Sequence, residues 1–434
     1  MVGGATAAIG GSSAPSLKRA VSAASIGNLL EWYDFSVYAF FAAPIARLYF
    51  PDSNPMRGVL LVFLTYGLGF IMRPVGAIVI GHFGDKHGRK SALVFTVLAM
   101  AFGTVLIGVL PTYATVGALG AVLLTVARLI QGFSAGGEWG GSTSFLVEYA
   151  PQDRRGFYGS LQQMTTVGGL VLGSAYGALL TGILSDQQML SWGWRLPFLS
   201  GILLAIVGLF LRAKVEETPK YEEIETRHQV AKAPFLEMLQ SYPKETFTAF
   251  SFTLLWTVGF YIVLTYMPTF MQQQLKIPAS QALLAAAAGQ LLLAVLIPFA
   301  GALSDRIGRR PLLITACAVF VVGIVPMFKF VVAVHELWAV LLNQLFWAVP
   351  LSFYSGAGPA AIAEIFPTKV RYVTLSTGYS IAVAIFGGFA PVIAQSLIAW
   401  TNDPISPAYY VIAAAVASLI TMIAIRETYN QPLR

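Results

Sequence analysis

The feature that most constrains the fold is a series of long apolar segments that recur along the whole chain. A run of about 20 apolar residues is the length at which an α-helix crosses a hydrocarbon core of roughly 30 Å. Only 11% of the residues are charged and 56% are hydrophobic, which excludes an ordinary soluble domain. We therefore predict an all-α membrane protein with twelve transmembrane helices. Their expected ranges are 20–48, 58–80, 91–110, 116–146, 157–184, 195–213, 247–272, 281–303, 311–333, 337–364, 371–399 and 407–425.

The basic residues indicate the orientation of these helices, and they argue against a nucleic-acid partner. If both termini lie on one side, as an even number of helices requires, 20 of the 27 Lys and Arg residues fall on that side. Basic residues are enriched in cytoplasmic loops, so we expect both termini in the cytoplasm. The first 17 residues are polar and precede a full-length apolar run, so we expect no cleaved signal peptide.

A charged segment between the sixth and seventh apolar runs divides the chain into two six-helix bundles. "GHFGDKHGRK" (81–90) and "GALSDRIGRR" (301–310) share Gly, Asp, base, Gly, Arg and base at equal spacing, which indicates duplicated halves. Many secondary transporters are built this way, with the substrate site at mid-membrane between the halves. The expected division is a disordered cytoplasmic tail at 1–19, bundles at 20–213 and 247–426, a cytoplasmic linker at 214–246 and a second tail at 427–434.

The repeated motif carries a family resemblance that covers all twelve segments. It resembles the loop motif of the major facilitator superfamily, which implies the major facilitator fold. The stretch from "FPTKVR" (366–371) to "PAYY" (407–410) is most similar to bacterial citrate and tricarballylate proton symporters. Other stretches resemble the metabolite:proton symporter family: "GNLLEWYDF" (27–35), "RPVGA" (73–77), "RLIQGFSAGGEWGG" (128–141), "RRGFYGS" (154–160), "WGWRLPF" (192–198) and "AIFGG" (384–388).

The resemblance also implies a gate, because this loop motif latches the cytoplasmic side of the superfamily when the outer side is open. The aspartates, just beyond a helix end, are placed to meet the N-terminus of a neighbouring helix. Ser304 replaces a family glycine in the second copy. The expected gating residues are Gly81, Asp85, Gly88, Arg89, Asp305, Arg309 and Arg73.

Few charged side chains lie inside the predicted helices, where each costs at least about 2.5 to 3.5 kcal/mol. Glu31 and Asp34 are three residues apart, so they share a helix face at about 5 to 6 Å. Two carboxylates at that distance favour binding of a proton, which suits a proton carrier. Glu138 is a further proton-coupling or gating candidate, and pairing with Arg73 is its structural alternative.

Arg128 lies near mid-depth and is the expected anchor for an anionic substrate. Its guanidinium never loses its proton and binds a carboxylate with two parallel hydrogen bonds. The bland alternative is a structural ion pair with Glu31 or Asp34. The expected substrate-binding residues are Arg128, Gln131, Gln344, Tyr38 and Tyr354, of which Gln344 is the counterpart of Arg128 in the second half.

Ser134 lies in a G-x-S-x-G match, but a hydrolase is a poor interpretation. A nucleophile elbow needs a strand-to-helix turn and a nearby base, whereas the four histidines fall in predicted loops or at helix ends. Gly132, Gly136 and Gly140 form G-x-x-x-G steps that let a neighbouring helix approach closely. We therefore predict packing glycines and no enzyme.

These observations lead to one functional prediction with alternatives. We expect a bacterial inner-membrane transporter that imports citrate or a related carboxylate with protons, by alternating access and as a functional monomer. The alternatives are a zwitterionic osmolyte such as proline or betaine, or a metabolite such as 2-oxoglutarate or shikimate. A sensor that binds without transport is an interpretation from another class. No metal site, cofactor motif or nucleotide-binding loop is present in the sequence, so partners beyond the organic anion, protons and lipid are not expected.

Overall fold

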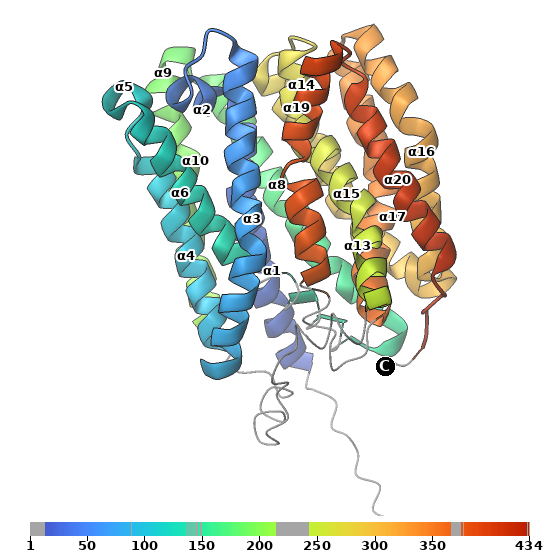
Figure 1. Cartoon of the computed structure of the whole chain (residues 1–434). Coiled ribbons are helices and arrows are strands. Elements are labelled where there is room, and N and C mark those ends of the chain that lie inside the picture. Colours follow the sequence, from blue (N-terminus) through green and yellow to red (C-terminus); the bar gives the residue numbers. More distant parts are fainter. Residues whose placement is uncertain are drawn as a thin grey trace, which may run out of the picture.

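The computed structural model describes residues 14–87, 89–136, 150–213, 243–365 and 377–431, and the isolated positions 139, 142, 143, 146, 147, 375 and 433 (Figure 1). Each predicted apolar segment contains helix in these ranges. Nine helices of the described chain are long and apolar enough to cross a membrane. Helices suit such sequences because they satisfy every backbone hydrogen bond inside the segment.

The first half is built around long helices joined by short ones (Figure 1). The first predicted segment is divided at Phe41 into a long and a short helix. The second continues through residue 87, so Asp85 lies inside the helix. The expectation that Asp85 lies just beyond the helix end is therefore wrong. The elements are α1 (Ala14–Phe40), α2 (Ala42–Tyr49), α3 (Pro55–His87), α4 (Arg89–Val109), α5 (Tyr113–Val116), α6 (Ala118–Ala135), η1 (Gln152–Arg154), α8 (Arg155–Ile183), α9 (Asp186–Ser191), η2 (Gly193–Arg195) and α10 (Leu196–Ala213).

The second half repeats this architecture and adds two π-helical segments. Both interrupt long helices near the middle of the bundle, where a π-helix often marks a functional site. The elements are α13 (Pro243–Phe260), η3 (Tyr261–Tyr266, π), α14 (Met267–Gln273), α15 (Ala279–Ile307), α16 (Arg309–Val334), α17 (Leu337–Ile365), η4 (Val383–Gly387, π), α19 (Ala390–Thr401) and α20 (Ser406–Ala424).

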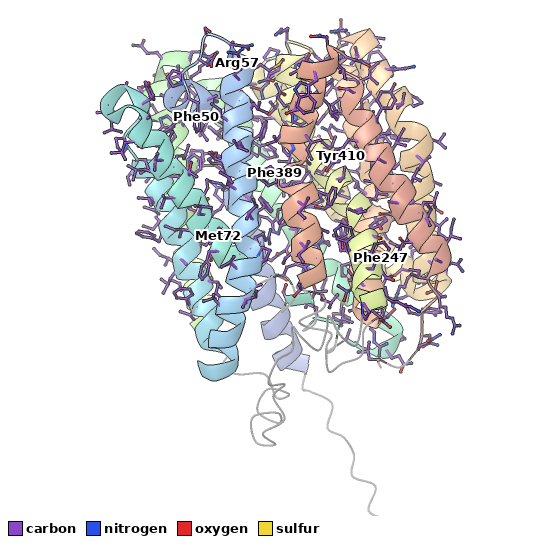
Figure 2. All side chains as sticks on the ribbon, viewed as in Figure 1. Phe50, Arg57, Met72, Phe247, Phe389 and Tyr410 are labelled. Carbon is purple, nitrogen blue, oxygen red and sulfur yellow. The ribbon has the colours of Figure 1, made fainter. Side chains whose placement is uncertain are left out.

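The beginning of α1 and the C-terminal residues lie at one end of the bundle, which we call the terminal end; the opposite end is the far end (Figure 1). Large apolar side chains project outward over the bundle, as Figure 2 shows. Phe299 and Val322, for example, are 70% and 75% exposed. An apolar outer surface on an otherwise close-packed bundle is the surface expected to face lipid.

Glycines of α6 allow close contact with α3. A Cβ on Gly132 would lie 1.6 Å from the Gly69 carbonyl oxygen, and one on Gly136 would lie 2.0 Å from that of Arg73. No side chain fits there, so the helices touch backbone to backbone. The packing role expected of Gly132 and Gly136 is confirmed, while Gly140 lies outside the described residues.

The two halves contact each other along the length of α8 and α15. Near the terminal end, a Cβ on Gly156 would lie 2.4 Å from the Gly301 carbonyl oxygen. Further along, the Ser174 hydroxyl donates to Gln290 Oε1 at 2.7 Å. On the other side of the interface, a Cβ on Gly67 of α3 would lie 2.7 Å from the Phe389 ring. The halves are therefore closed around the centre of the molecule.

Candidate functional site

Arg128 occupies an aromatic enclosure in the first half. Its side chain is fully buried, and Cζ lies 4.9 Å, 4.3 Å and 5.0 Å from the ring centroids of Phe35, Tyr38 and Tyr66. Nη1 donates to Gln131 Oε1 at 2.6 Å, whereas Nε and Nη2 have no hydrogen-bond partner. A buried cation with unsatisfied donors is costly, so these two groups favour an anionic ligand.

A chain of hydrogen bonds joins Arg128 to Asp34. Arg128 donates to Gln131, and Gln131 Nε2 donates to the Thr104 hydroxyl at 2.7 Å. Thr104 in turn donates to Asp34 Oδ2 at 2.7 Å. Three helices, α1, α4 and α6, supply these side chains. These hydrogen bonds connect Asp34 to Gln131, the group that holds the Arg128 guanidinium.

Glu31 has a different partner from Asp34. Arg73 Nη2 donates to Glu31 Oε1 at 2.9 Å, and both side chains are buried. Arg73 Cζ also lies 6.0 Å from the Trp32 ring and 5.2 Å from the Phe70 ring. Glu31 and Asp34 therefore have separate partners, Arg73 and Thr104, and the proton-coupling role expected of the pair stays a prediction.

Arg128 itself forms no ion pair with an acidic residue of the described chain. The alternative prediction, a structural ion pair of Arg128 with Glu31 or Asp34, is therefore wrong. Arg73 forms the ion pair with Glu31 instead. Its side chain lies beside Glu31 and Trp32, and the gating role expected of Arg73 stays a prediction.

The other substrate-binding candidates divide into two groups. Tyr38 covers Arg128 and shares a hydrogen bond with Thr65, and Gln131 binds Arg128 directly. Tyr354 donates instead to the Phe252 carbonyl oxygen at 2.6 Å, within the second half. Gln344 packs against Gly289 of α15, and neither of its side-chain polar atoms has a hydrogen-bond partner. The structure thus brings Tyr38 and Gln131 to Arg128, but not Tyr354 or Gln344.

A small cavity lies between the halves near this cluster. Its volume is about 10 Å³, roughly the space of one water molecule. Five aromatic residues line it, together with Gln163, Thr166 and Thr257. The aromatic ones are Trp32 from α1, Trp256 and Phe260 from α13, Tyr261 from η3, and Tyr379.

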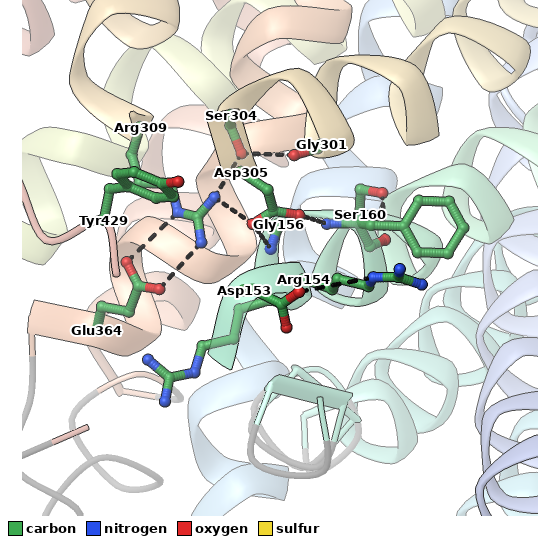
Figure 3. Close-up of polar contacts among 12 residues, drawn as sticks. Asp153, Arg154, Gly156, Ser160, Gly301, Ser304, Asp305, Arg309, Glu364 and Tyr429 are labelled. Atoms are coloured by element: carbon green, nitrogen blue, oxygen red, sulfur yellow. Dashed lines mark hydrogen bonds and ion pairs between the residues drawn. The ribbon is translucent and has the colours of Figure 1, made fainter. Parts of the chain in front are cut away.

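A second cluster of buried charges lies near the terminal end, where α15 meets the start of α8, and Figure 3 shows its polar contacts. Asp305, in the last turn of α15, accepts hydrogen bonds from the backbone N–H groups of Gly156 and Phe157, both at 2.8 Å. These groups lie at the N-terminus of α8, where a carboxylate is favoured. This contact with a neighbouring helix N-terminus is the one predicted for Asp305, although Asp305 lies inside its helix and not beyond the helix end.

Arg309 ties that contact to the rest of the second half. It donates to Asp305 Oδ1 at 2.7 Å and to Ser304 Oγ at 2.8 Å, and it forms an ion pair with Glu364 at 3.2 Å (Figure 3). Gly308 precedes it with a φ of +100°, a backbone conformation that favours glycine. The second copy of the loop motif therefore forms a turn and a saturated ionic network.

The C-terminal segment 426–431 crosses over this network. Glu427 accepts from the backbone N–H groups of Arg309 and Arg310 at 3.1 Å and 2.9 Å, so it caps α16. In the other half, Gln152 and Arg155 donate to the carbonyl oxygens of Asn430 and Gln431 at 2.9 Å and 2.8 Å. The segment is therefore bonded to both halves.

Several predicted positions lie outside the description that the structure gives. Gly88 and Glu138 lie outside the described residues, as do the side chains of Asp85 and Arg89 and the surroundings of Gly81. The proton-coupling role of Glu138 and the gating role of the first motif copy stay predictions.

Ser134 takes part in helix packing. It is buried in α6, and its hydroxyl donates to the Thr96 carbonyl oxygen of α4. It therefore lies within a continuous helix and lacks the strand-to-helix turn of a nucleophile elbow.

Sequence reasoning missed Thr104 and most of the aromatic cavity. Thr104 is an ordinary residue of an apolar helix, and nothing in its neighbours marks it. Trp256 and Phe260 carry a weak signal, because bulky aromatic residues cluster in "WTVGFY" (256–261), whereas Tyr379 carries none. Their convergence depends on the packing of distant helices, which periodicity does not reveal.

Comparisons with known proteins identify the chain's relatives. The model of the Sugar (and other) transporter family matches residues 20–246, and the Major Facilitator Superfamily model matches residues 249–433. The Proline/betaine transporter of Salmonella typhimurium is 34% identical over 96% of this chain and 85% of its own length. A Glycine betaine/proline/ectoine/pipecolic acid transporter of Dickeya dadantii is 33% identical over the same shares. A Putative proline/betaine transporter of Staphylococcus aureus is 36% identical over 93% and 87%.

Solved structures agree on the fold. The proton:xylose symporter XylE bound to 6-bromo-6-deoxy-D-glucose superposes with a TM-score of 0.80 at 18% identity, over 97% of this chain and 98% of that one. The inward open conformation of XylE from E. coli gives a TM-score of 0.74 at 18% identity, over 96% and 98%. The expected twelve-helix fold is confirmed. The expected resemblance to citrate and tricarballylate symporters is not supported, because these relatives are named for proline and betaine.

Proposed function

Because this chain belongs to the major facilitator superfamily, we propose that it is a secondary transporter of a zwitterionic osmolyte such as proline or betaine, driven by protons. The 34% identity to a proline/betaine transporter over 96% of the chain supports this substrate class. The proposal includes a bacterial inner membrane, cytoplasmic termini and a monomeric working unit. It also includes the division into two bundles joined by a linker. The two bundles rock against each other during transport.

The single observation that carries the proposal is the unsatisfied guanidinium of Arg128. Proline and betaine each have one carboxylate and one positive nitrogen, whereas citrate has three carboxylates. In the middle of the described bundle, Arg73 is neutralised by Glu31 and Arg128 alone has no acidic partner. One free guanidinium balances one carboxylate, and the excess charge of a tricarboxylate would stay uncompensated in a buried site.

Proton coupling is assigned to Asp34. Protonation of Asp34 removes the negative charge from one end of the series of hydrogen bonds that runs through Thr104 and Gln131 to Arg128. The positive charge of Arg128 then has one carboxylate fewer in its surroundings, which favours the carboxylate of the substrate. Release of the proton on the other side of the membrane reverses this preference, so substrate and proton move together.

Alternating access requires the network at the terminal end to open. Asp305 must leave the N-terminus of α8, and segment 426–431 must leave Gln152 and Arg155. Gly81, Asp85, Gly88, Arg89 and Glu138 are proposed to take part on the side of the first half. The far end has to close before this opening, so that no continuous pore forms.

Uptake into proteoliposomes tests the function. Labelled proline, betaine and citrate are offered separately, with the outside at lower pH than the lumen or at equal pH. We expect proline or betaine to accumulate only with the gradient, and citrate neither to accumulate nor to compete. Accumulation of citrate, or zwitterion uptake that ignores the gradient, would refute the proposal.

A further inference from the structure

The aromatic cavity between the halves has a composition unlike that of an ordinary packing defect. Its lining rings face one another at close range: Trp32 and Phe260 are 5.5 Å apart, and Trp256 and Tyr379 are 6.1 Å apart. Trp32 comes from the first half and the others from the second. The rings therefore meet at the interface between the halves, which the proposed rocking motion would open.

No charged side chain lines this cavity in the part of the chain that the structure describes. A cation inside it would be stabilised by the negative faces of the rings, which act best on weakly hydrated ammonium groups. A primary ammonium brings three N–H donors, more than the two unpartnered hydroxyls of the lining can accept. The lining therefore favours a methylated or cyclic ammonium group.

Two hydroxyl groups add a second kind of contact. Thr257 Oγ1 and the Tyr261 hydroxyl line the cavity, and neither has a hydrogen-bond partner, although their residues are only 3% and 1% exposed. Buried hydroxyls are normally satisfied. A secondary ammonium, such as the ring nitrogen of proline, carries two N–H groups that these oxygens can accept. A quaternary ammonium such as that of betaine uses only the rings.

Phe35 lies between Trp32 of this cavity and the guanidinium of Arg128, and it also contacts Arg73. Its ring centroid is 6.2 Å from that of Trp32, 5.6 Å from Arg73 Cζ and 4.9 Å from Arg128 Cζ. Arg73 Nη1 and two nitrogens of Arg128 have no hydrogen-bond partner. If Phe35 moves aside, a carboxylate can take the place of its ring between Arg73 and Arg128. That place is 6.2 Å from the Trp32 ring of the cavity. That separation suits a small zwitterion.

We propose that the aromatic cavity formed by Trp32, Trp256, Phe260, Tyr261 and Tyr379 is the subsite for the positive end of the substrate, and that it accepts quaternary and secondary ammonium groups by different contacts. This assignment rests on the proposed function. The rings bind the methyl groups of a quaternary ammonium, and Thr257 and Tyr261 bind the N–H groups of a secondary one. The cavity volume of about 10 Å³ is too small for an ammonium group with its substituents. Binding of the substrate must therefore move the rings apart.

A pair of isosteric ligands tests the role of charge. Betaine and 3,3-dimethylbutanoate have the same shape and carboxylate, but the second has a neutral carbon in place of nitrogen. Binding is measured on the purified full chain by competition with labelled betaine or proline. We expect wild-type protein to prefer betaine by about tenfold or more. Tyr379→Leu, which removes a ring, should shrink this preference several-fold, whereas Tyr379→Phe should keep it.

Thr257→Val tests the second contact with little risk to folding, because its hydroxyl has no partner to lose. Proline binding should weaken about fivefold, while betaine binding should stay within twofold. If wild-type protein binds betaine or proline but Tyr379→Leu keeps the preference for betaine, the cavity assignment is wrong and the function stands. Equal losses for proline and betaine in Thr257→Val would also overturn it. If wild-type protein binds neither ligand, both proposals fail.

Discussion

Arg128 and Arg309 are both buried arginines of this bundle, but their surroundings differ completely. Arg309 is bonded to Asp305, Ser304 and Glu364. Arg128 has one neutral partner, Gln131, and two nitrogens without any. A saturated cation holds two parts of a protein together, whereas an unsaturated one is ready to bind a ligand. This difference in partners is the basis for the roles that we propose, with Arg309 in a latch and Arg128 in substrate binding.

Removal of the saturated arginine should have the largest effect. Arg309→Gln leaves Asp305 and Glu364 buried without their cation, and breaking a buried ion pair in this way costs about 3 to 5 kcal/mol. We expect a Tm several degrees lower and a terminal end that is more accessible to thiol reagents at engineered cysteines. Substrate affinity should change little, because Arg309 is remote from Arg128.

Arg306→Gln is the matched control, since Arg306 lies three residues earlier, in the last turn of α15, and is exposed. It should leave Tm and accessibility as in wild type. An Arg309→Gln protein with unchanged Tm and accessibility would show that the network does not latch the terminal end.

Removal of the unsaturated arginine should affect binding instead of stability. Arg128→Gln loses the charge that holds the substrate carboxylate, and we expect affinity for proline or betaine to fall about 100-fold. Tm should change by only a few degrees, because Arg128 makes a single side-chain hydrogen bond. Equilibrium binding and thermal unfolding measure both quantities on one sample.

Arg195→Gln serves as the control for this variant. Arg195 is partly buried and donates to the Gly108 carbonyl oxygen, away from the centre. Wild-type affinity in Arg128→Gln, or an equal loss in Arg195→Gln, would contradict the assignment of Arg128 to the substrate.

Asp34→Asn sharpens the comparison further, because it removes the carboxylate that we propose as the proton carrier and keeps the shape of the side chain. We expect exchange of labelled for unlabelled substrate to continue, while accumulation against a gradient falls about tenfold. Counterflow and net uptake, measured on the same proteoliposomes, distinguish these processes. Normal accumulation would mean that another group carries the proton.

Thr104→Val should have the smallest effect. Valine preserves the volume of threonine but breaks the links to Asp34 and Gln131, and each such hydrogen bond contributes about 1 kcal/mol. We expect affinity at one pH to change about threefold, and its dependence on pH to flatten. A pH dependence like that of wild type would show that Asp34 and Arg128 communicate without Thr104.

Helix content was predictable from sequence because the length of an apolar run directly reflects the thickness of a membrane. Gly132 and Gly136 were likewise predictable, since four-residue spacing places small residues on one helix face. Asp305 was predictable because a repeated Asp beside bases at a helix end marks a contact between helices. These signals depend on residues close together in sequence. The structure shows both the close glycine contacts and the Asp305 contact with the start of α8.

The arrangement of the central site was less accessible to such reasoning. Glu31 and Asp34 lie on nearly the same face of α1, but residues three apart still differ by about 60° around a helix. That angle is enough to direct one toward α3 and the other toward α4. The partners of Arg128 and the walls of the aromatic cavity come from helices far apart in sequence, so only packing brings them together.

The short segment 426–431 has a consequence for the working cycle. It is attached to the cap of α16 in one half and to Gln152 and Arg155 in the other, so it spans the line along which the halves must part. Every opening of the terminal end must peel one of these attachments away, and every closure must restore it. We therefore expect the strength of these attachments to influence how long the terminal end stays closed in each cycle.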